Sequence, residues 1–342
     1  MTVTGHAQTE SAVERATRGL DALMKWYNPD TGIWDTTGWW NSANVLYVVI
    51  DYMERTGSRA YVDQVENTYQ LNVAGGFLNN FYDDEGWWGL TWVHAYDVLG
   101  DERYLETAKL IFDDMTIGWD EVCGGGIWWT KKRGYKNAIP NELFILLAAK
   151  LYNRTEDKVY LDWAQRTWAW FDQSGMINKL NLVNDGLRDC ENNGDITWTY
   201  NQGVILGALV ELADVTGDET LIDRAQLIAD AAITLIIEEG ILREPCELSF
   251  NCGADGPQFK GIFMRHLGTL YEMTGEPRYA DFIHLNATSI WDKSRSDEDQ
   301  FGLRWGARHD RADASRQSSA LDALLVAIPR PADANASATE AP

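Results

Sequence analysis

Two apolar patterns alternate along the chain, and each of them predicts helices. After Asp101, apolar residues recur three or four positions apart from Tyr104 to Met115, which is the spacing of a helix with one buried face. Residues 143–149 (LFILLAA) and 203–210 (GVILGALV) are instead apolar nearly all round. Helices of this second kind are buried on every side. The alternation therefore predicts an inner set of buried helices and an outer set of amphipathic ones.

A short turn motif recurs before the amphipathic helices. The glycine in most copies can end one helix, and the Asp, Glu or Ser that follows can cap the next. Successive copies lie about 43 to 61 residues apart, which leaves room for two helices and two loops. Each copy therefore marks a helix–turn–helix junction. The copies are RTGSRAY ending at Tyr61, VLGDERY at Tyr104, NRTEDKVY at Tyr160, VTGDETL at Leu221 and MTGEPRY at Tyr279.

About twelve helices follow from these patterns. In six pairs they predict an all-α (α/α)6 toroid, with an inner and an outer ring, built by one domain over residues 9–328. An open solenoid is the alternative, but it requires polar capping repeats that the sequence does not clearly show. Residues 1–8 and 329–342 are small, polar and rich in Pro or Ala, so we expect a frayed N-terminus and a disordered tail. The helices are expected at about residues 8–26, 40–55, 60–79, 87–98, 101–116, 137–152, 158–174, 199–215, 219–237, 259–274, 277–294 and 316–327.

The composition narrows the possible partners. The 342 residues include 52 Asp and Glu against 29 Lys and Arg, a net charge of −23, which disfavours nucleic acid and anionic membranes. The sequence contains no run of 18 apolar residues, the length that a membrane-spanning helix requires. Met1 is not followed by the basic and apolar segment of a secretion leader, and the compartment stays open. We expect a monomer.

Tryptophan and cysteine usage adds two points. The chain has 16 Trp and 14 Tyr, which suggests a site that stacks flat apolar faces such as those of sugar rings. The four cysteines, Cys123, Cys190, Cys246 and Cys252, include no CxxC pair, so a zinc site is disfavoured. Cys246 and Cys252 could close a small loop, although disulfide formation depends on the compartment.

Polar and aromatic residues introduce each expected inner helix. Because all inner helices of a toroid begin at the same end, these residues should meet at one mouth. Amides that bond hydroxyls and aromatic rings that stack are what a sugar cleft needs. Helix capping and core filling are the alternative roles, and we expect them for two or three of the nine candidates. The candidate groove residues are Trp39, Trp40, Asn44, Trp88, Trp128, Asn141, Tyr200, Asn201 and Gln202.

Asp83 and Asp84 are the candidate catalytic pair. Retaining glycosidases need two carboxyls about 5–5.5 Å apart, and adjacent residues in a turn can provide them. Close carboxylates also separate their proton affinities, so that one holds a proton while the other is ionised. The alternative is an acidic cap on a helix that begins near Trp87. Asp113 and Asp114, late in an outer helix, are interpreted as solvated surface.

Other polar features carry less chemistry. Three glycines after Cys123 could let backbone approach a ligand or could form a flexible loop. Asp185 lies in a polar loop that could reach the mouth, although a turn residue is the simpler interpretation. His94 and His266 fall inside expected inner helices, where we expect buried, hydrogen-bonded histidines.

At this point the sequence resembles glycoside hydrolase family 76, the endo-α-1,6-mannanases. The resemblance covers about residues 26–325. Several long motifs in order make it more specific than an Asp pair alone. They are YDDEGWWGLTWVHAYDVLGDERYL, WDEVCGGGIWW, YKNAIPNELFILLAAKLY, TYNQGVILGALVEL and FKGIFMRHL.

The resemblance implies a fold and a chemistry. It implies an (α/α)6 barrel and a retaining, endo-acting hydrolysis of α-1,6-mannan, with Asp83 as nucleophile and Asp84 as acid/base. It implies neither a metal nor an organic cofactor. Family members are usually secreted, and related fungal proteins are membrane-anchored transglycosylases. A carbohydrate-binding or transglycosylating toroid remains the main alternative. A sugar epimerase or uronide hydrolase is less favoured, because such epimerases rely on histidines and the five His lie outside the mouth segments.

Overall fold

The computed structural model describes residues 10–249 and 251–330 of the 342-residue chain. The predicted termini 1–8 and 331–342 lie outside the described residues. The described chain forms twelve α-helices: α1 (Ala12–Met24), α2 (Trp39–Thr56), α3 (Val62–Asn72), α4 (Tyr82–Leu99), α5 (Glu102–Thr116), α6 (Ala138–Thr155), α7 (Lys158–Gln173), α8 (Thr199–Thr216), α9 (Thr220–Leu235), α10 (Gly256–Thr274), α11 (Pro277–Lys293) and α12 (Ala314–Leu325).

Strands contribute little to the described chain. Three antiparallel hairpins of two-residue strands lie in loops, and three short 3-10 helices lie beside them. The strand pairs are β1 (Tyr27–Asn28) with β2 (Ile33–Trp34), β3 (Leu187–Arg188) with β4 (Glu191–Asn192), and β5 (Ile237–Glu238) with β6 (Ile241–Leu242). The 3-10 helices are η1 (Val73–Gly75), η2 (Val122–Gly124) and η3 (Pro245–Ser249).

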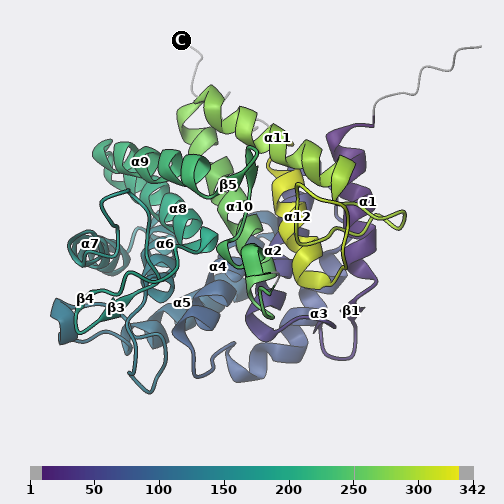
Figure 1. Cartoon of the computed structure of the whole chain (residues 1–342). Helices are drawn as coiled ribbons and strands as arrows, with labels where there is room; N and C mark the ends of the chain where they lie inside the picture. Colours follow the sequence, from purple (N-terminus) through teal and green to yellow (C-terminus); the bar gives the residue numbers. More distant parts are fainter. Residues whose placement is uncertain (1–9, 250, 331–342) are drawn as a thin grey trace, which may run out of the picture.

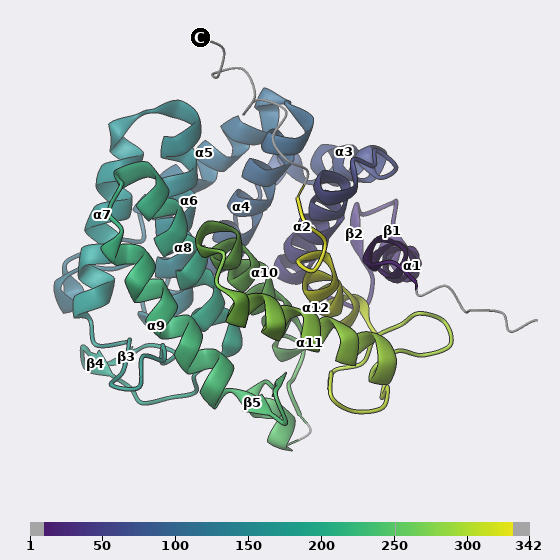
Figure 2. The ribbon, with the colours of Figure 1, turned by 90° about the horizontal axis from the view of Figure 1, so that it is seen from above.

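The even-numbered helices form a closed inner ring. Each packs against the next, and α12 packs against α2 to close the circle. The odd-numbered helices lie outside this ring, as the view from above shows (Figures 1 and 2). None of the described helices is long and apolar enough to cross a membrane. The predicted (α/α)6 toroid is confirmed, and the open solenoid is excluded by the contact between α12 and α2.

Burial differs between the rings as the sequence pattern predicted. Most residues of α6 and α8 are buried, on all sides of each helix, whereas α5 and α9 bury one face. Inner helices also approach one another closely. A Cβ at Gly203 of α8 would lie only 2.5 Å from the Cα of Phe263 on α10, so this contact depends on the missing side chain.

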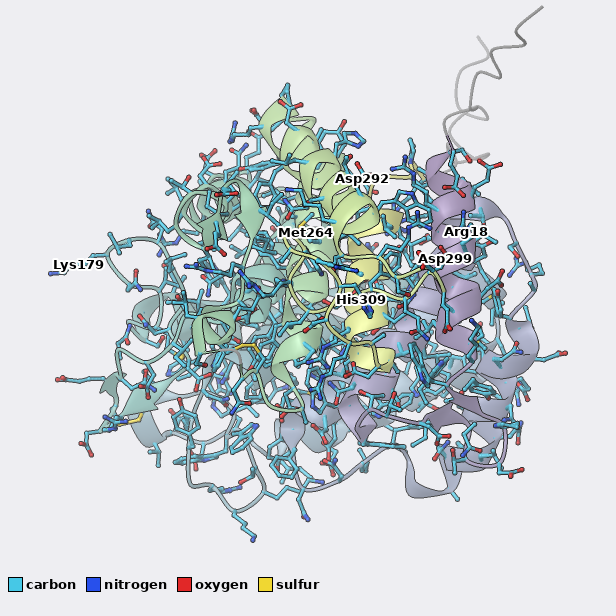
Figure 3. All side chains as sticks on the ribbon, turned by 45° about the vertical axis from the view of Figure 1, so that its right-hand side comes forward. Arg18, Lys179, Met264, Asp292, Asp299 and His309 are labelled. Atoms are coloured by element: carbon cyan, nitrogen blue, oxygen red, sulfur yellow. A yellow bond between two sulfur atoms is a disulfide. The ribbon has the colours of Figure 1, made fainter. Side chains whose placement is uncertain are left out.

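Covalent and ionic links secure the loops and termini. Disulfides join Cys123 to Cys190 and Cys246 to Cys252, and the second is the small loop that the spacing allowed. Arg18 of α1 pairs with Asp299 at 2.7 Å, which ties the first helix to the loop before α12 (Figure 3).

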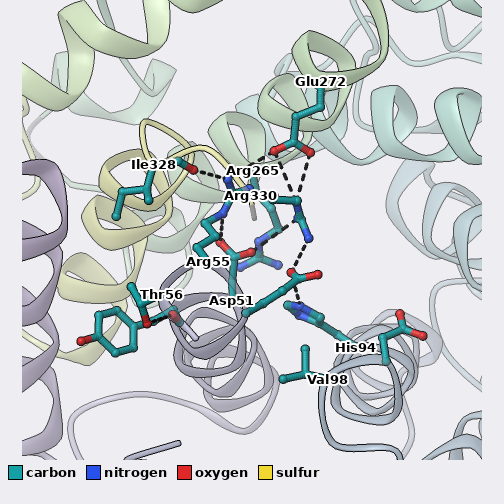
Figure 4. A network of polar contacts seen from close by, with 12 residues as sticks. Asp51, Arg55, Thr56, His94, Val98, Arg265, Glu272, Ile328 and Arg330 are labelled. Atoms are coloured by element: carbon teal, nitrogen blue, oxygen red, sulfur yellow. Dashed lines mark hydrogen bonds and ion pairs between the residues drawn. The ribbon is translucent and has the colours of Figure 1, made fainter. Parts of the chain in front are cut away.

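Three boundaries differ from the prediction. Helix α4 begins at Tyr82 rather than near Trp87, so the acidic pair lies inside its first turn. Helix α3 ends at Asn72, where a 3-10 turn follows. The tail was expected to be disordered from residue 329, but Arg330 is bound by carboxylates under the barrel (Figure 4).

Candidate active site

A cavity of about 550 Å³ opens where the inner helices begin. Half of its lining comes from the first turns of inner helices and half from the loops that precede them, because both converge at this end of the toroid. The helical residues are Trp40 of α2, Asp83, Asp84 and Trp87 of α4, Tyr200 of α8 and Phe259 of α10. The loop residues are Phe81, Trp129, Tyr135, Asn137, Asp185 and Asp255.

The two carboxylate oxygens of Asp83 differ in their hydrogen bonds. Its Oδ2 accepts a hydrogen bond from the Nε1 of Trp129 at 3.0 Å. Its Oδ1 is buried and has no partner among the described residues. Burial and the charge of Asp84 raise the pKa of Asp83 well above its ordinary value, and the bond from Trp129 acts in the opposite direction.

Asp84 is held by the loop that precedes α4. Its Oδ2 accepts a hydrogen bond from the Nδ2 of Asn79 at 2.6 Å. Burial raises the pKa of Asp84 to about 6, the Asn79 bond lowers it, and the charge of Asp255 raises it further. Two carboxyls in one cavity resist losing both protons. The pair therefore retains a proton near neutral pH, as acid/base chemistry requires.

Four aromatic rings form a continuous wall beside the carboxylates. The rings of Trp40 and Trp87 stack with centroids 5.7 Å apart, and Tyr200 stacks on Phe259 at 4.0 Å. The Nε1 of Trp40 also donates to Oδ1 of Asp255 at 2.9 Å. Such a wall offers flat apolar faces, and Asp255 at its rim offers an acceptor for hydroxyls.

A second cavity of about 620 Å³ adjoins the first, since Tyr135 and Asp185 line both. The OH of Tyr135 donates to Oδ2 of Asp185 at 2.6 Å. The disulfide between Cys123 and Cys190 lies in its wall and joins the glycine loop to the β3–β4 hairpin. Trp128 lines this second cavity, not the first. Asp185, interpreted from sequence as a turn residue, thus lies at the junction of the two cavities.

Six of the nine predicted groove residues do not line either cavity, which corrects the expectation of two or three. Only Trp40 and Tyr200 lie in the first cavity and Trp128 in the second. The remaining six are wholly or largely buried in the packed interior. They are Trp39, Asn44, Trp88, Asn141, Asn201 and Gln202.

The buried amides mostly clamp backbone. Asn141 accepts from the N–H of Ile127 at 2.7 Å and donates to its carbonyl at 3.0 Å. Gln202 holds Val183 in the same way, at 2.7 and 2.8 Å. An amide side chain that pairs with one peptide unit satisfies a loop that the core has buried. These residues therefore shape the mouth without reaching a ligand.

The remaining members of the six have other positions. Asn44 accepts from Arg265 deep in the barrel at 3.0 Å. Asn201 is fully buried, and its side chain has no partner among the described residues. Trp39 and Trp88 pack against each other and against Phe77.

The sequence-based prediction missed several residues that line the cavities. Their spacing in the sequence could have identified them. Asp83 and Trp87 are four residues apart, so they share a helix face once α4 begins at Tyr82. Trp128 and Trp129 are neighbours in an extended segment, where side chains alternate between faces. Trp129 consequently meets Asp83, while Trp128 donates to Asp120 at 2.8 Å on the other side.

The structure confirms some of the predictions made for the remaining acidic residues and histidines, and corrects others. Asp113 is exposed as predicted, but Asp114 is half-buried and pairs with Lys131 at 2.8 Å. His94 is buried and bonded to Glu54 as predicted, at 3.1 Å. His266 is buried, but its Nε2 has no partner among the described residues. No histidine lines the described part of the first cavity.

Comparisons with known proteins agree with this geometry. The chain is 28% identical to the Lin0763 protein of Listeria innocua, with a TM-score of 0.85 and coverage of 93% of this chain and 97% of that one. It is 27% identical over 302 residues to a mannan endo-1,6-alpha-mannosidase of Candida glabrata, covering 78% of this chain and 67% of the relative.

A third comparison concerns the site. The chain is 25% identical to the α-1,6-mannanase GH76A of Salegentibacter sp. HEL1_6, with a TM-score of 0.85 and coverage of 93% and 99%. That structure is an inactive variant in which two consecutive aspartates are replaced by asparagine, in complex with α-1,6-mannotriose.

Paired carboxylates in an aromatic-lined cavity at one mouth of a helical toroid define a glycoside hydrolase. The model of glycosyl hydrolase family 76 matches residues 11–338, nearly the whole chain. The chain therefore belongs to glycosyl hydrolase family 76. The family and the enzyme class predicted from sequence are both confirmed.

Proposed function

We propose that this enzyme cleaves α-1,6-mannosidic bonds inside a mannan backbone, with Asp83 as nucleophile and Asp84 as acid/base. One observation carries the proposal. Of the two Asp-Asp pairs discussed above, Asp83–Asp84 alone opens into the aromatic-lined cavity, while Asp113–Asp114 lies on an outer helix. The relatives named as endo-1,6-mannosidases and the mannotriose complex support the substrate class.

The first step forms a covalent intermediate. A carboxylate oxygen of Asp83 bonds to the anomeric carbon as the bond from that carbon to the glycosidic oxygen breaks. Asp84 donates its proton to that oxygen, which leaves as a hydroxyl. In the reactive form the single proton of the pair must therefore be on Asp84, so that Asp83 is ionised when it attacks.

The second step releases the sugar. Asp84, now ionised, takes a proton from water, and the resulting oxygen attacks the anomeric carbon to displace Asp83. Two inversions leave the configuration retained. Retention requires two closely spaced carboxyls, and Asp83 and Asp84 line the same cavity from adjacent positions of α4. We further propose that the enzyme acts as a monomer.

Proton NMR of the first product from unbranched α-1,6-mannan tests the mechanism. The proposal expects the α-anomer to form first and to mutarotate afterwards. An initial β-anomer would mean inversion and would contradict the assigned roles. Size analysis of early products tests endo action, which expects oligosaccharides before mannose. Release of mannose alone from the outset would overturn it.

A further inference from the structure

Three consecutive acidic residues begin α4, and the third faces a different place from the first two. Asp83 and Asp84 line the cavity, whereas Glu85 is fully buried and does not line it. Successive helical residues point about 100° apart, so the third carboxyl turns toward the loops packed behind α4. A buried carboxyl so close to the reacting groups requires a physical account.

Glu85 is linked to Asp84 through Asn79. Its Oε1 accepts a hydrogen bond from the backbone N–H of Asn79 at 3.1 Å. The side chain of that same Asn79 donates to Oδ2 of Asp84 at 2.6 Å, and its own oxygen accepts from the N–H of Phe81 at 2.7 Å. Glu85 thus fixes the backbone of the residue that holds Asp84.

Glu85 is linked to Asp83 through the segment that contains Lys131 and Trp129. The Nζ of Lys131 bonds Oε1 of Glu85 at 2.9 Å. The segment of Lys131 is joined to the loop before α4 by two backbone bonds, from Lys131 N–H to the Asn80 carbonyl at 3.0 Å and from Tyr82 N–H to the Trp129 carbonyl at 3.0 Å. Trp129 in this segment donates to Oδ2 of Asp83 at 3.0 Å.

We propose that Glu85 is a positioning residue for both catalytic aspartates, acting on Asp84 through Asn79 and on Asp83 through Lys131 and Trp129. The proposal rests on the catalytic roles given above to Asp83 and Asp84. Glu85 touches neither the cavity nor a reacting atom, so it acts only through these loops.

The charge state of the cluster fits this role. Burial raises the pKa of Glu85 to about 8, and a hydrogen bond with Asp114 raises it too, while Lys131 lowers it. At neutral pH Glu85 is therefore mostly protonated, and Lys131 balances the charge of Asp114 at 2.8 Å. A neutral Glu85 can hold both loops without adding charge beside the catalytic pair. The groups that set the pKa of Asp84 are its own burial, Asn79 and Asp255, and it also faces Asp83.

The decisive variants are Glu85→Met, which removes the acceptor while keeping volume, and Glu85→Gln, which keeps an acceptor oxygen. Glu211→Met is the matched control, since Glu211 is an inner-helix glutamate bonded to Lys150 at 3.0 Å in the half of α8 remote from the cavity. On unbranched α-1,6-mannan, Glu85→Met should lower kcat on the order of 100-fold with KM nearly unchanged, because small misplacements of reacting groups cost about that much. Glu85→Gln should keep most of kcat, and Glu211→Met should keep all of it.

A second measurement does not depend on catalysis. The titration of Asp84, followed by carboxyl NMR and assigned with Asp84→Asn, should move to higher pH in Glu85→Met and in Asn79→Ala, because the Asn79 bond that lowers its pKa is weakened or lost. Unchanged titration in a folded Glu85→Met protein would overturn the proposal, even if the wild-type enzyme proved inactive on mannan. If Glu85→Met does not fold, Lys131→Met and Asn79→Ala at half-exposed positions decide the question. Normal kcat in both would overturn it.

Discussion

Both ends of the toroid contain buried carboxylates, but the partners of these carboxylates differ between the two ends. At the mouth, Asp83 and Asp84 face a cavity and their bonds come from neutral groups, Trp129 and Asn79. Their pKa values are raised. At the other end, Asp51 of α2 bonds Arg55 at 2.9 Å with both side chains buried (Figure 4).

Arginine side chains lower the pKa values of the carboxylates at the paired end. Burial alone would raise the pKa of Asp51, but Arg55 and Arg330 together lower it. The pKa of Glu54 is lowered as well, because bonds and charge from His94 and Arg330 outweigh its burial. The paired end is suited to stability, and the mouth keeps carboxyls with mobile protons for chemistry.

The largest effect is expected at the mouth. Asp83→Asn and Asp84→Asn should each lower turnover of α-1,6-mannan by orders of magnitude, since proton transfer alone contributes about 10²–10⁴-fold. Melting temperature should change little, because neither carboxylate is paired with a cation. Substrates with good leaving groups should restore part of the glycosylation rate of Asp84→Asn but not that of Asp83→Asn.

Exposed Asp113 is the control for this experiment, and Asp113→Asn should leave activity unchanged. Near-normal turnover in either mouth variant would remove the role given to that residue.

The opposite result is expected at the paired end. Asp51→Asn should lower the free energy of unfolding by on the order of 3 kcal/mol, because it removes the buried anion that pairs with Arg55 and leaves that arginine only Glu272, at 3.2 Å, as an anionic partner. Activity at low temperature should persist, since α2 separates Asp51 from Trp40 by about three helical turns. Chemical denaturation measures the loss. Asp101→Asn, which breaks an exposed pair with Arg103 at 2.6 Å, should cost under about 1 kcal/mol. Equal losses in the two variants would contradict the contrast.

The pH dependence of stability should also separate the two ends. Burial raises the pKa of Glu85 and of Glu244 to about 8, from an ordinary value of 4.5. The folded protein then holds these protons more tightly than the unfolded chain. Their contribution to stability is complete below pH 4.5 and is lost as pH rises through 8. Asp322, which interacts with Asp51 and Arg55 at the paired end, is an exception there, because burial outweighs the pairing with Arg265 and raises its pKa to about 6.

At the paired end the sign is reversed. The lowered pKa of Glu54 contributes stability above its ordinary value of 4.5 that is lost as pH falls below it. Unfolding free energies measured from pH 3 to 9 should therefore peak in the mildly acidic range. Glu244→Gln should flatten the alkaline decline by on the order of a few kcal/mol. An unchanged alkaline slope in that variant would show that Glu244 does not carry the effect.

The smallest effect is expected from the aromatic wall. Trp40→Ala should raise KM about tenfold and leave kcat nearly unchanged, because stacking of a sugar ring is worth about 1–1.5 kcal/mol and does not involve the reacting bond. Buried Trp88, predicted from sequence to bind sugar, instead packs on Trp92 at 5.8 Å. Trp88→Leu should therefore lower the melting temperature with little change in KM. A larger KM effect from Trp88 than from Trp40 would reverse the assignment made from the structure.

The sequence by itself determined the ring architecture and the enzyme class. Apolar periodicity separates inner from outer helices because burial on all sides and burial on one face leave different patterns. Turn glycines such as Gly57 and Gly100, both left-handed in the structure, mark where helices end. The adjacent Asp83 and Asp84, within motifs that resemble a family, indicated a glycosidase before any coordinates.

Only the tertiary structure decided which mouth residues face the cavity. Trp39 and Trp40 are neighbours in sequence, yet one packs on Phe77 and the other lines the cleft, since a one-residue step turns a helix by about 100°. Asn141 and Gln202 look like sugar ligands in sequence but pair with the backbone of loops folded over them. Whether a buried amide serves a ligand or a peptide group depends on which chain segment arrives beside it, and that is a property of the packed fold.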